Sequence, residues 1–162
     1  MTSPPVGPGH VAGCFSCDVD RRPDSSPRER VWVSTHWRVA HAFNSALPGW
    51  LVMLPRRHVT AIAELGPAEA AELGPLLADL SRALSVVTGC VKTYVLQLAE
   101  AEGFSHVHFH VVPRAAEMPD DIRGPQVFSL LGGPVGEWVA DDEQDRLALA
   151  LALALAAEPV RR

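Results

Sequence analysis

The stretch HVHFHVVPR, residues 106–114, is the most informative part of this sequence for its fold and its chemistry. Histidines occupy positions 106, 108 and 110, and apolar side chains fill the positions between them. Successive side chains of a β-strand point to opposite faces, so the pattern predicts a strand with three imidazoles on one face and a core-packing row on the other. A half-exposed strand usually carries threonine or charged residues in such a row. The sequence therefore indicates a functional site.

The histidine row by itself is compatible with several roles. The imidazoles could be solvent-facing or satisfied by hydrogen bonds, although three in register make this a poor explanation. Imidazoles two residues apart can also chelate one ion. In this second interpretation, the protein is a metalloenzyme in which all three histidines bind one catalytic metal. In a third interpretation, one imidazole attacks phosphorus while its neighbours orient it and bind the phosphate oxygens.

Working outward, the sequence predicts an α+β fold with a mainly antiparallel sheet of about five strands. The expected strands are residues 31–35, 37–43, 50–54, 91–99 and 106–112, which are rich in β-branched and aromatic residues. Gly66 and the proline after it begin a helix with leucines at three- and four-residue spacing, and Gly89 ends it. The Gly-Pro pair at 74–75 is expected to kink or divide this helix. A final helix, apolar on two sides, is expected at about 142–157.

Composition indicates a single globular domain without a basic face for duplex nucleic acid. The 162 residues are 48% hydrophobic and 20% charged, with a formal net charge of -5. The N-terminus lacks the features of a secretory signal, and the longest apolar run, 147–157, is too short to span a bilayer. These features predict a cytoplasmic protein with no membrane partner. The expected organisation is a flexible arm at 1–13, a domain at 14–114 and a C-terminal extension at 115–162.

Two of the three cysteines, Cys14 and Cys17, form a C-x-x-C pair, and Cys90 stands apart. In a reducing compartment such a pair indicates metal ligands or a redox couple. Residues 18–30 are expected to form an exposed loop, so no helix start follows Cys14 to lower its pKa. This disfavours the redox alternative. A pair of partly buried thiols without a ligand remains the simplest competing explanation.

HVHFHVV resembles the signature of the histidine-triad (HIT) family, in which three histidines alternate with apolar residues. The segment LPGWLVMLPRRHV, residues 47–59, is similar to the family's glycine-containing turn, strand and Pro-x-x-His motif. The resemblance runs from about residue 14 to residue 114 and is strongest to the zinc-containing bacterial HIT nucleotide hydrolases. It implies a HIT-like fold that acts at the α-phosphate of a purine nucleotide, with dinucleoside polyphosphates or nucleoside phosphoramidates as substrates. A nucleotide-binding regulatory protein with little turnover is the alternative.

The resemblance also implies roles for the three histidines. His108 would be the nucleophile and would form a nucleotidyl-histidine intermediate, which water or another acceptor then breaks down. His110 would donate a hydrogen bond to a phosphate oxygen. The backbone carbonyl of His106 would hold the His108 ring in its attacking tautomer. No catalytic cofactor is implied.

The binding residues match the family pattern less closely than the triad does. Relatives usually have a Gly-Gln-Ser/Thr run before the first histidine, whereas this chain has Gly103, Phe104 and Ser105. Asn44 is the nearest match to the residue that binds the ribose hydroxyls, and Gln97 is similar to a phosphate-contacting amide. Trp50 replaces the histidine that usually follows the turn glycine, and ordinary packing would explain it.

Some HIT proteins that begin with C-x-x-C hold a structural zinc ion, and the resemblance implies the same site here. Its ligands would be Cys14, Cys17, His58 and His106. A closed tetrahedral site would fasten the N-terminal segment, which has too few apolar residues to dock by burial alone. A homodimer is also expected, because the long helix and the two-sided final helix offer more apolar surface than one small domain covers.

Overall fold

Five strands form a single sheet in the order β1-β2-β3-β5-β4, and each neighbouring pair is antiparallel. The computed structural model describes residues 9–23 and 25–157. The strands are β1 (Trp32–Val33), β2 (Trp37–His41), β3 (Leu51–Pro55), β4 (Lys92–Gln97) and β5 (Phe109–Arg114). The α+β class and the five-stranded antiparallel sheet predicted from the sequence are therefore confirmed.

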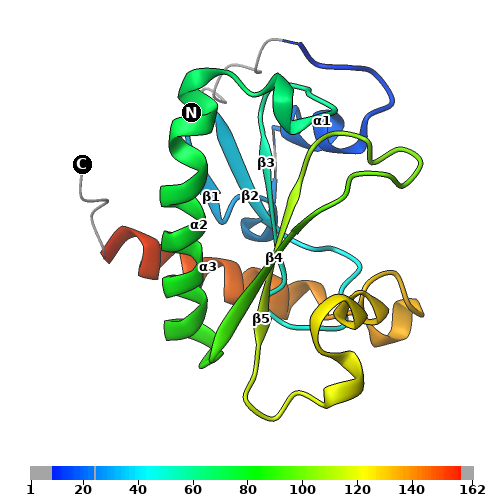
Figure 1. Cartoon of the computed structure of the whole chain (residues 1–162), viewed down its shortest axis with the longest axis vertical. Helices are drawn as coiled ribbons and strands as arrows, with labels where there is room; N and C mark the ends of the chain where they lie inside the picture. The colour runs from blue at the N-terminus through cyan, green and yellow to red at the C-terminus, as the bar shows by residue number, and fades with distance from the viewer. Residues whose placement is uncertain (1–8, 24, 158–162) are drawn as a thin grey trace.

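The three α-helices are α1 (Phe15–Asp20), α2 (Pro67–Thr88) and α3 (Asp141–Ala157). Short 3₁₀ helices lie between them: η1 (Pro27–Glu29), η2 (Ile62–Glu64), η3 (Asp120–Ile122), η4 (Gly124–Leu130) and η5 (Val135–Glu137). In Figure 1, α2 runs alongside the sheet, α3 crosses near its lower end, and η3 to η5 gather on the other side. None of the helices in the described part of the chain is long and apolar enough to cross a membrane.

Side chains that alternate along β5 belong to two different hydrophobic cores. Phe109 and Val111 belong to the larger core, where the sheet meets Leu80 of α2 and Leu151 of α3. Val112 belongs to a smaller core on the opposite face, built with residues of the segment that follows β5. His110 shares this second face because side chains two apart in a strand point the same way. The sheet thus gives one face to the main core and the other to a site.

The strand predicted at residues 106–112 wrongly includes the first two of the three triad histidines. β5 begins at Phe109, so His106 and His108 precede the strand. The amide of Val107 donates to the carbonyl of Val59 at 2.8 Å, which ties this segment to the loop after β3 instead of to the sheet ladder. The histidines therefore do not form one uniform row.

The long helix begins and ends where the sequence predicts, with Gly66 as N-cap and Gly89 as C-cap. Gly89 has φ +71°, in the left-handed region that glycine enters without strain. Of the two outcomes expected at Gly74-Pro75, a kink or a division, the division is wrong, because one helix continues through Pro75. The final helix begins at Asp141, one residue before the expected start.

The segment after Cys14 departs from the prediction of an exposed loop. It forms α1, with Cys14 as its N-cap residue, so the expectation that no helix starts there was wrong. Val19 and Asp20 are buried. Residues 1–8 of the expected flexible arm lie outside the described residues.

Candidate functional site

The structure assigns the three triad histidines to two different places. His106 faces His58, with ring centroids 4.8 Å apart, next to the two N-terminal cysteines. His108 and His110 lie together, with ring centroids 4.9 Å apart, in the wall of a cavity of about 370 Å³. Three imidazoles on one catalytic metal would have to converge. The metalloenzyme interpretation is therefore excluded by the direction of His106.

The ring of His108 is oriented by the backbone. Its Nδ1 lies 2.8 Å from the carbonyl oxygen of His106. A carbonyl oxygen only accepts, so Nδ1 carries the proton and Nε2 carries the free lone pair. An imidazole in this state offers a nucleophilic nitrogen to the cavity that it lines.

Two aromatic side chains fix the position of the His110 ring. The indole Nε1 of Trp50 donates to His110 Nδ1 at 3.1 Å. The ring of Phe128, from η4, lies edge to face against His110, with centroids 5.1 Å apart. Burial, together with the neighbouring His108, lowers the pKa of His110 to about 4. His110 is therefore a neutral imidazole at physiological pH.

The cavity is lined by aromatic rings as well as by imidazoles. Phe15 lies 5.1 Å from Phe43 and 5.2 Å from Phe104, measured between ring centroids, and all three line the cavity. These rings come from α1, from the loop after β2 and from the loop before the triad. His108 and His110 line the same cavity. Such a cavity suits a ligand with one flat apolar part and one anionic part.

The predicted binding residues are only partly brought together. Asn44 lines the cavity, and its carbonyl accepts a hydrogen bond from the amide of Gly132 at 2.9 Å. Gln97, Gly103 and Ser105 do not line it, although their neighbours Leu98 and Phe104 do. The sequence patterns missed Phe15, Phe43 and Phe128, because isolated phenylalanines in loops carry no periodic signal.

The four predicted metal ligands form one cluster. The ligand atoms of Cys14, Cys17, His58 and His106 all lie within 4.8 Å of one another. The sulfur of Cys17 is 3.4 Å from His58 Nδ1 and 3.7 Å from His106 Nδ1, and the sulfur of Cys14 is 3.6 Å from His106 Nδ1. Metal–ligand bonds of 2.0 to 2.3 Å in a tetrahedron place ligand atoms about 3.3–3.8 Å apart. These three separations match that geometry, and every other pair of ligand atoms lies within 4.8 Å.

The protonation of the cluster also suits a cation. His106 Nε2 lies 2.8 Å from the carbonyl of Pro55 and donates to it, which leaves the Nδ1 lone pair facing the two sulfurs. Burial lowers the pKa of His106 to about 4, so the ring stays neutral. Burial also raises the pKa of the Cys17 thiol to about 11, so this thiol would have to lose its proton to bind a metal. Two cysteine and two histidine side chains form a ligand set that zinc prefers.

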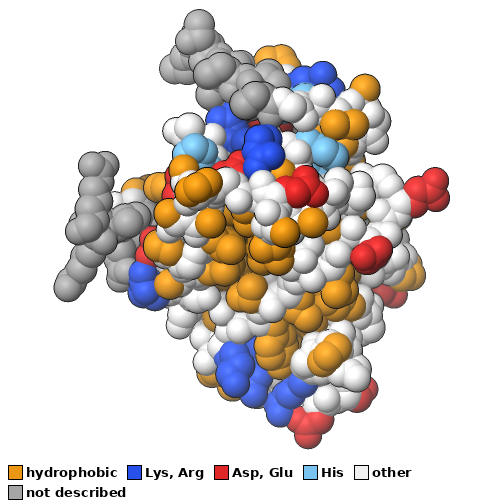
Figure 2. All heavy atoms as spheres, turned by 45° about the horizontal axis from the view of Figure 1, so that its top comes forward, with side chains coloured by type: hydrophobic (Ala, Val, Ile, Leu, Met, Phe, Trp, Pro, Cys, Tyr) orange, Lys and Arg blue, Asp and Glu red, His pale blue; other side chains and the backbone are white. Residues whose placement is uncertain are grey.

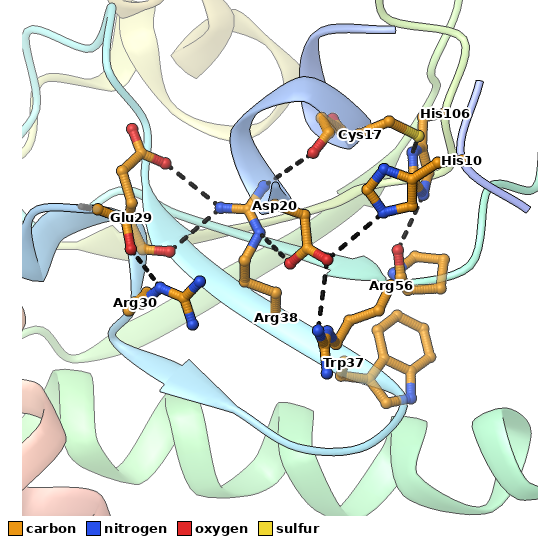
Figure 3. A network of polar contacts seen from close by, with 12 residues as sticks. His10, Cys17, Asp20, Glu29, Arg30, Trp37, Arg38, Arg56 and His106 are labelled. Atoms are coloured by element: carbon orange, nitrogen blue, oxygen red, sulfur yellow. Dashed lines mark hydrogen bonds and ion pairs between the residues drawn. The ribbon is translucent and has the colours of Figure 1, made fainter. Parts of the chain in front are cut away.

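A buried ionic network next to the cluster fastens the same segment (Figure 3). Asp20 of α1 lies 3.5 Å from Arg38, 3.4 Å from Arg56 and 3.6 Å from His10. Arg38 also donates to the backbone carbonyl of Glu29 at 3.1 Å. The segment therefore docks through buried ion pairs and Val19 as well as through the cluster. The sequence argument, which left zinc as the main anchor, missed this network.

No protein-family model and no curated protein sequence matches this chain. Solved structures do match over most of its length. A histidine-triad nucleotide-binding protein from Sulfolobus tokodaii, described as hypothetical, has a TM-score of 0.67 and 14% identity, covering 89% of this chain and 93% of that one. A histidine-triad protein from Bradyrhizobium japonicum has a TM-score of 0.64 and 21% identity, covering 78% and 89%.

A third match is a zinc-bound histidine-triad family protein from Mycobacterium smegmatis, with a TM-score of 0.62 and 16% identity. It covers 93% of this chain and 100% of that one. The TM-scores of 0.62 to 0.67 and the coverage of 78 to 93% of this chain lead to one conclusion: this chain has the fold of the histidine-triad proteins.

Proposed function

We propose that the chain is a HIT-type hydrolase or nucleotidyl transferase that acts at the α-phosphate of a purine nucleotide. The observation that carries the proposal is the His108 ring, whose Nδ1 donates to the His106 carbonyl while the ring lines the cavity. That bond leaves Nε2 free to attack phosphorus. Nucleotide binding by a protein of the same fold, the one from Sulfolobus tokodaii, is consistent with it.

The reaction has two displacements at phosphorus. The Nε2 lone pair of His108 forms a bond to the α-phosphorus while the bond from phosphorus to the leaving group breaks. Water then displaces the imidazole, which releases the nucleoside monophosphate and restores His108. Two inversions give overall retention, and inorganic phosphate in place of water would give a diphosphate instead.

The remaining cavity residues take binding roles. The aromatic group formed by Phe15, Phe43 and Phe104 suits stacking and apolar contact with a purine. Asn44 would bind the ribose hydroxyls, and His110 would donate to a phosphate oxygen. We also propose that the phosphate or the leaving group is contacted by Gln97, Gly103 and Ser105. These residues would have to move toward the cavity when substrate binds.

The experiment that tests the activity is a substrate panel followed by product analysis. Diadenosine tetraphosphate, adenosine phosphoramidate and their guanosine analogues are incubated with the protein, with and without inorganic phosphate. We expect release of the nucleoside monophosphate from at least one of them. Cavity binding without any product across the panel would favour the alternative below.

Asn44→Ala is expected to raise KM about tenfold and to leave kcat nearly unchanged. A ribose hydrogen bond made equally in the ground state and the transition state contributes about 1.4 kcal/mol of uniform binding. Steady-state kinetics on the best substrate measures both constants. A fall in kcat with unchanged KM would place Asn44 in the chemical step and contradict the ribose role.

A nucleotide-binding regulatory protein with slow turnover is the second candidate. Ser105, the one hydroxyl left in the altered loop, is exposed and does not line the cavity. Handling of the leaving group would then be weak while binding persists. Nucleotide affinity combined with slow formation of the covalent intermediate in a single-turnover experiment would identify this case.

We propose further that the cysteine–histidine cluster holds a structural zinc ion. Three of the separations between its donors fit a tetrahedral ion, which supports this, and a zinc-bound protein shares the fold. The ion would hold α1 against the loop that carries His106, and the chemistry at His108 would not pass through it. Paired thiols reserved for a metal suit a reducing compartment such as the cytoplasm.

We also propose that the chain forms a homodimer through the face of α2 and β4. β4 is an edge strand, and Val86, Val91 and Val95 of this region are exposed. Figure 2 shows hydrophobic side chains spread over the face that it presents. An apolar edge strand with unpaired backbone groups favours pairing with a second chain.

Light scattering at micromolar concentration is expected to give a particle of twice the 17.4 kDa chain mass. Val95→Lys should shift it to the monomer, because a lysine at the edge opposes pairing. Leu153→Lys, a change at an exposed leucine of α3, is the matched control and should leave the dimer intact. A wild-type monomer would contradict the proposal.

A further inference from the structure

Trp50 occupies the position where the family resemblance expects a histidine, and its indole Nε1 lies 3.1 Å from His110 Nδ1. We propose that Trp50 is a positioning residue that fixes His110 as the neutral tautomer protonated on Nε2. The catalytic consequence rests on the proposed function, whereas the tautomer itself does not.

The tautomer of His110 follows from the hydrogen bonds that an indole and an imidazole can make. An indole N–H donates and has no acceptor, so the Nδ1 that receives it must carry a lone pair. The remaining proton of a neutral imidazole is then on Nε2. Trp50 is 0% exposed and His110 is 7% exposed, so water competes little for either nitrogen.

Packing holds the rings of Trp50 and His110 in the orientation that this hydrogen bond requires. Trp50 stands perpendicular to His110, with centroids 5.7 Å apart and an interplanar angle of 89°. Phe128 contacts both, with centroids 5.6 Å from Trp50 and 5.1 Å from His110. The three rings come from separate segments, before β3, within β5 and within η4. A flip of the imidazole would bring a carbon to face the indole N–H, and the buried hydrogen bond would be lost.

His108 and His110 therefore present opposite tautomers. His108 donates through Nδ1 to a carbonyl and offers an Nε2 lone pair, while His110 accepts through Nδ1 and offers an Nε2–H. The first is suited to attack and the second to donate to a phosphate oxygen. Loss of the Nε2 proton would leave His110 as an imidazolate, so His110 acts as a fixed donor and does not protonate the leaving group. A histidine at position 50 could donate or accept and would not enforce this state.

Two-dimensional ¹H–¹⁵N correlation spectra of the imidazole nitrogens test the assignment on the full-length protein. The His110 signals are assigned by their loss in His110→Gln. In the wild type we expect one neutral form with Nε2 protonated and Nδ1 unprotonated. A wild-type spectrum with Nδ1 protonated would overturn the proposal, whether or not any variant folds.

Trp50→Phe keeps an aromatic ring and removes the donor. We expect a mixture of both His110 tautomers, with kcat lowered about 10- to 100-fold and KM changed by less than about threefold. Trp37→Phe is the matched control, because Trp37 is also fully buried and donates its Nε1–H to a carbonyl, that of Glu69, at 3.0 Å. It should leave the His110 spectrum unchanged.

The two readouts separate the failure of this proposal from failure of the proposed function. If no nucleotide is turned over, the activity is wrong, and the His110 spectra still decide the role of Trp50. If kcat falls in Trp50→Phe while His110 keeps a single Nε2–H tautomer, the indole acts only through packing and the proposal is wrong.

Discussion

Replacement of His108 by glycine is expected to abolish turnover, with kcat/KM lower by roughly 10⁴-fold or more. The variant lacks the nitrogen that attacks phosphorus, and the two other imidazoles among the residues that line the cavity offer no free Nε2 lone pair. His110 carries a proton on Nε2, and His41 Nε2 accepts a hydrogen bond from the amide of Gly49 at 3.0 Å. Nucleotide affinity and the melting temperature should stay close to those of the wild type, since His108 is only half-buried. Steady-state kinetics, binding and thermal unfolding measure the three properties.

His36→Ala is the matched control for removal of a histidine. His36 lies outside both the cavity and the metal cluster and is 3.8 Å from Glu72 at the surface. Its turnover should equal that of the wild type. A substantial residual rate in His108→Gly would show that another group performs the attack.

Loss of the metal centre should have the second large effect. Cys17→Ala is expected to remove the zinc and to lower the free energy of unfolding by about 4 kcal/mol, or the melting temperature by roughly 10 °C. The metal would join α1 to the loop before β5, and its removal leaves His106 and His58 without their cationic partner. Metal analysis of protein purified without chelator, combined with thermal unfolding, measures both quantities.

Cys90→Ala is the control for loss of a buried thiol. Cys90 lies in the main core, away from the cluster, and its replacement should keep one zinc per chain and cost about 1 kcal/mol. His108→Gly should also keep the metal. Wild-type protein that is fully stable without zinc would contradict the metal centre.

Much of the fold can be predicted from local pattern. Alternating β-branched residues mark the strands, and glycines at 66 and 89 mark the ends of α2, because backbone preference decides both. The metal cluster was predictable through the family resemblance, since its ligands belong to three recognisable motifs. The long helix survives Pro75 despite its local cost, because Leu76, Leu80 and Leu84 bury one face of the helix in the core.

The other parts of the site depend on tertiary contacts that produce no periodic pattern in the sequence. Asp20 looks like a surface charge in a polar stretch and Arg38 like a charge on an expected strand, yet the fold buries them as partners 3.5 Å apart. Arg56 is buried in the same place, with Asp20 as one partner. Phe128 belongs to a segment with no readable pattern and reaches His110 only after the chain returns across the sheet.

The most direct test of the central claim is detection of a nucleotidyl group on His108. Protein is mixed with adenosine phosphoramidate or diadenosine tetraphosphate, quenched within one turnover under conditions that preserve phosphorus–nitrogen bonds, and analysed by peptide mass spectrometry. The account predicts a nucleoside monophosphate adduct on the peptide that contains residues 106–114, localised to His108 and absent from His108→Gly. Product formation with no adduct at any quench time, or an adduct on a different residue, would contradict it.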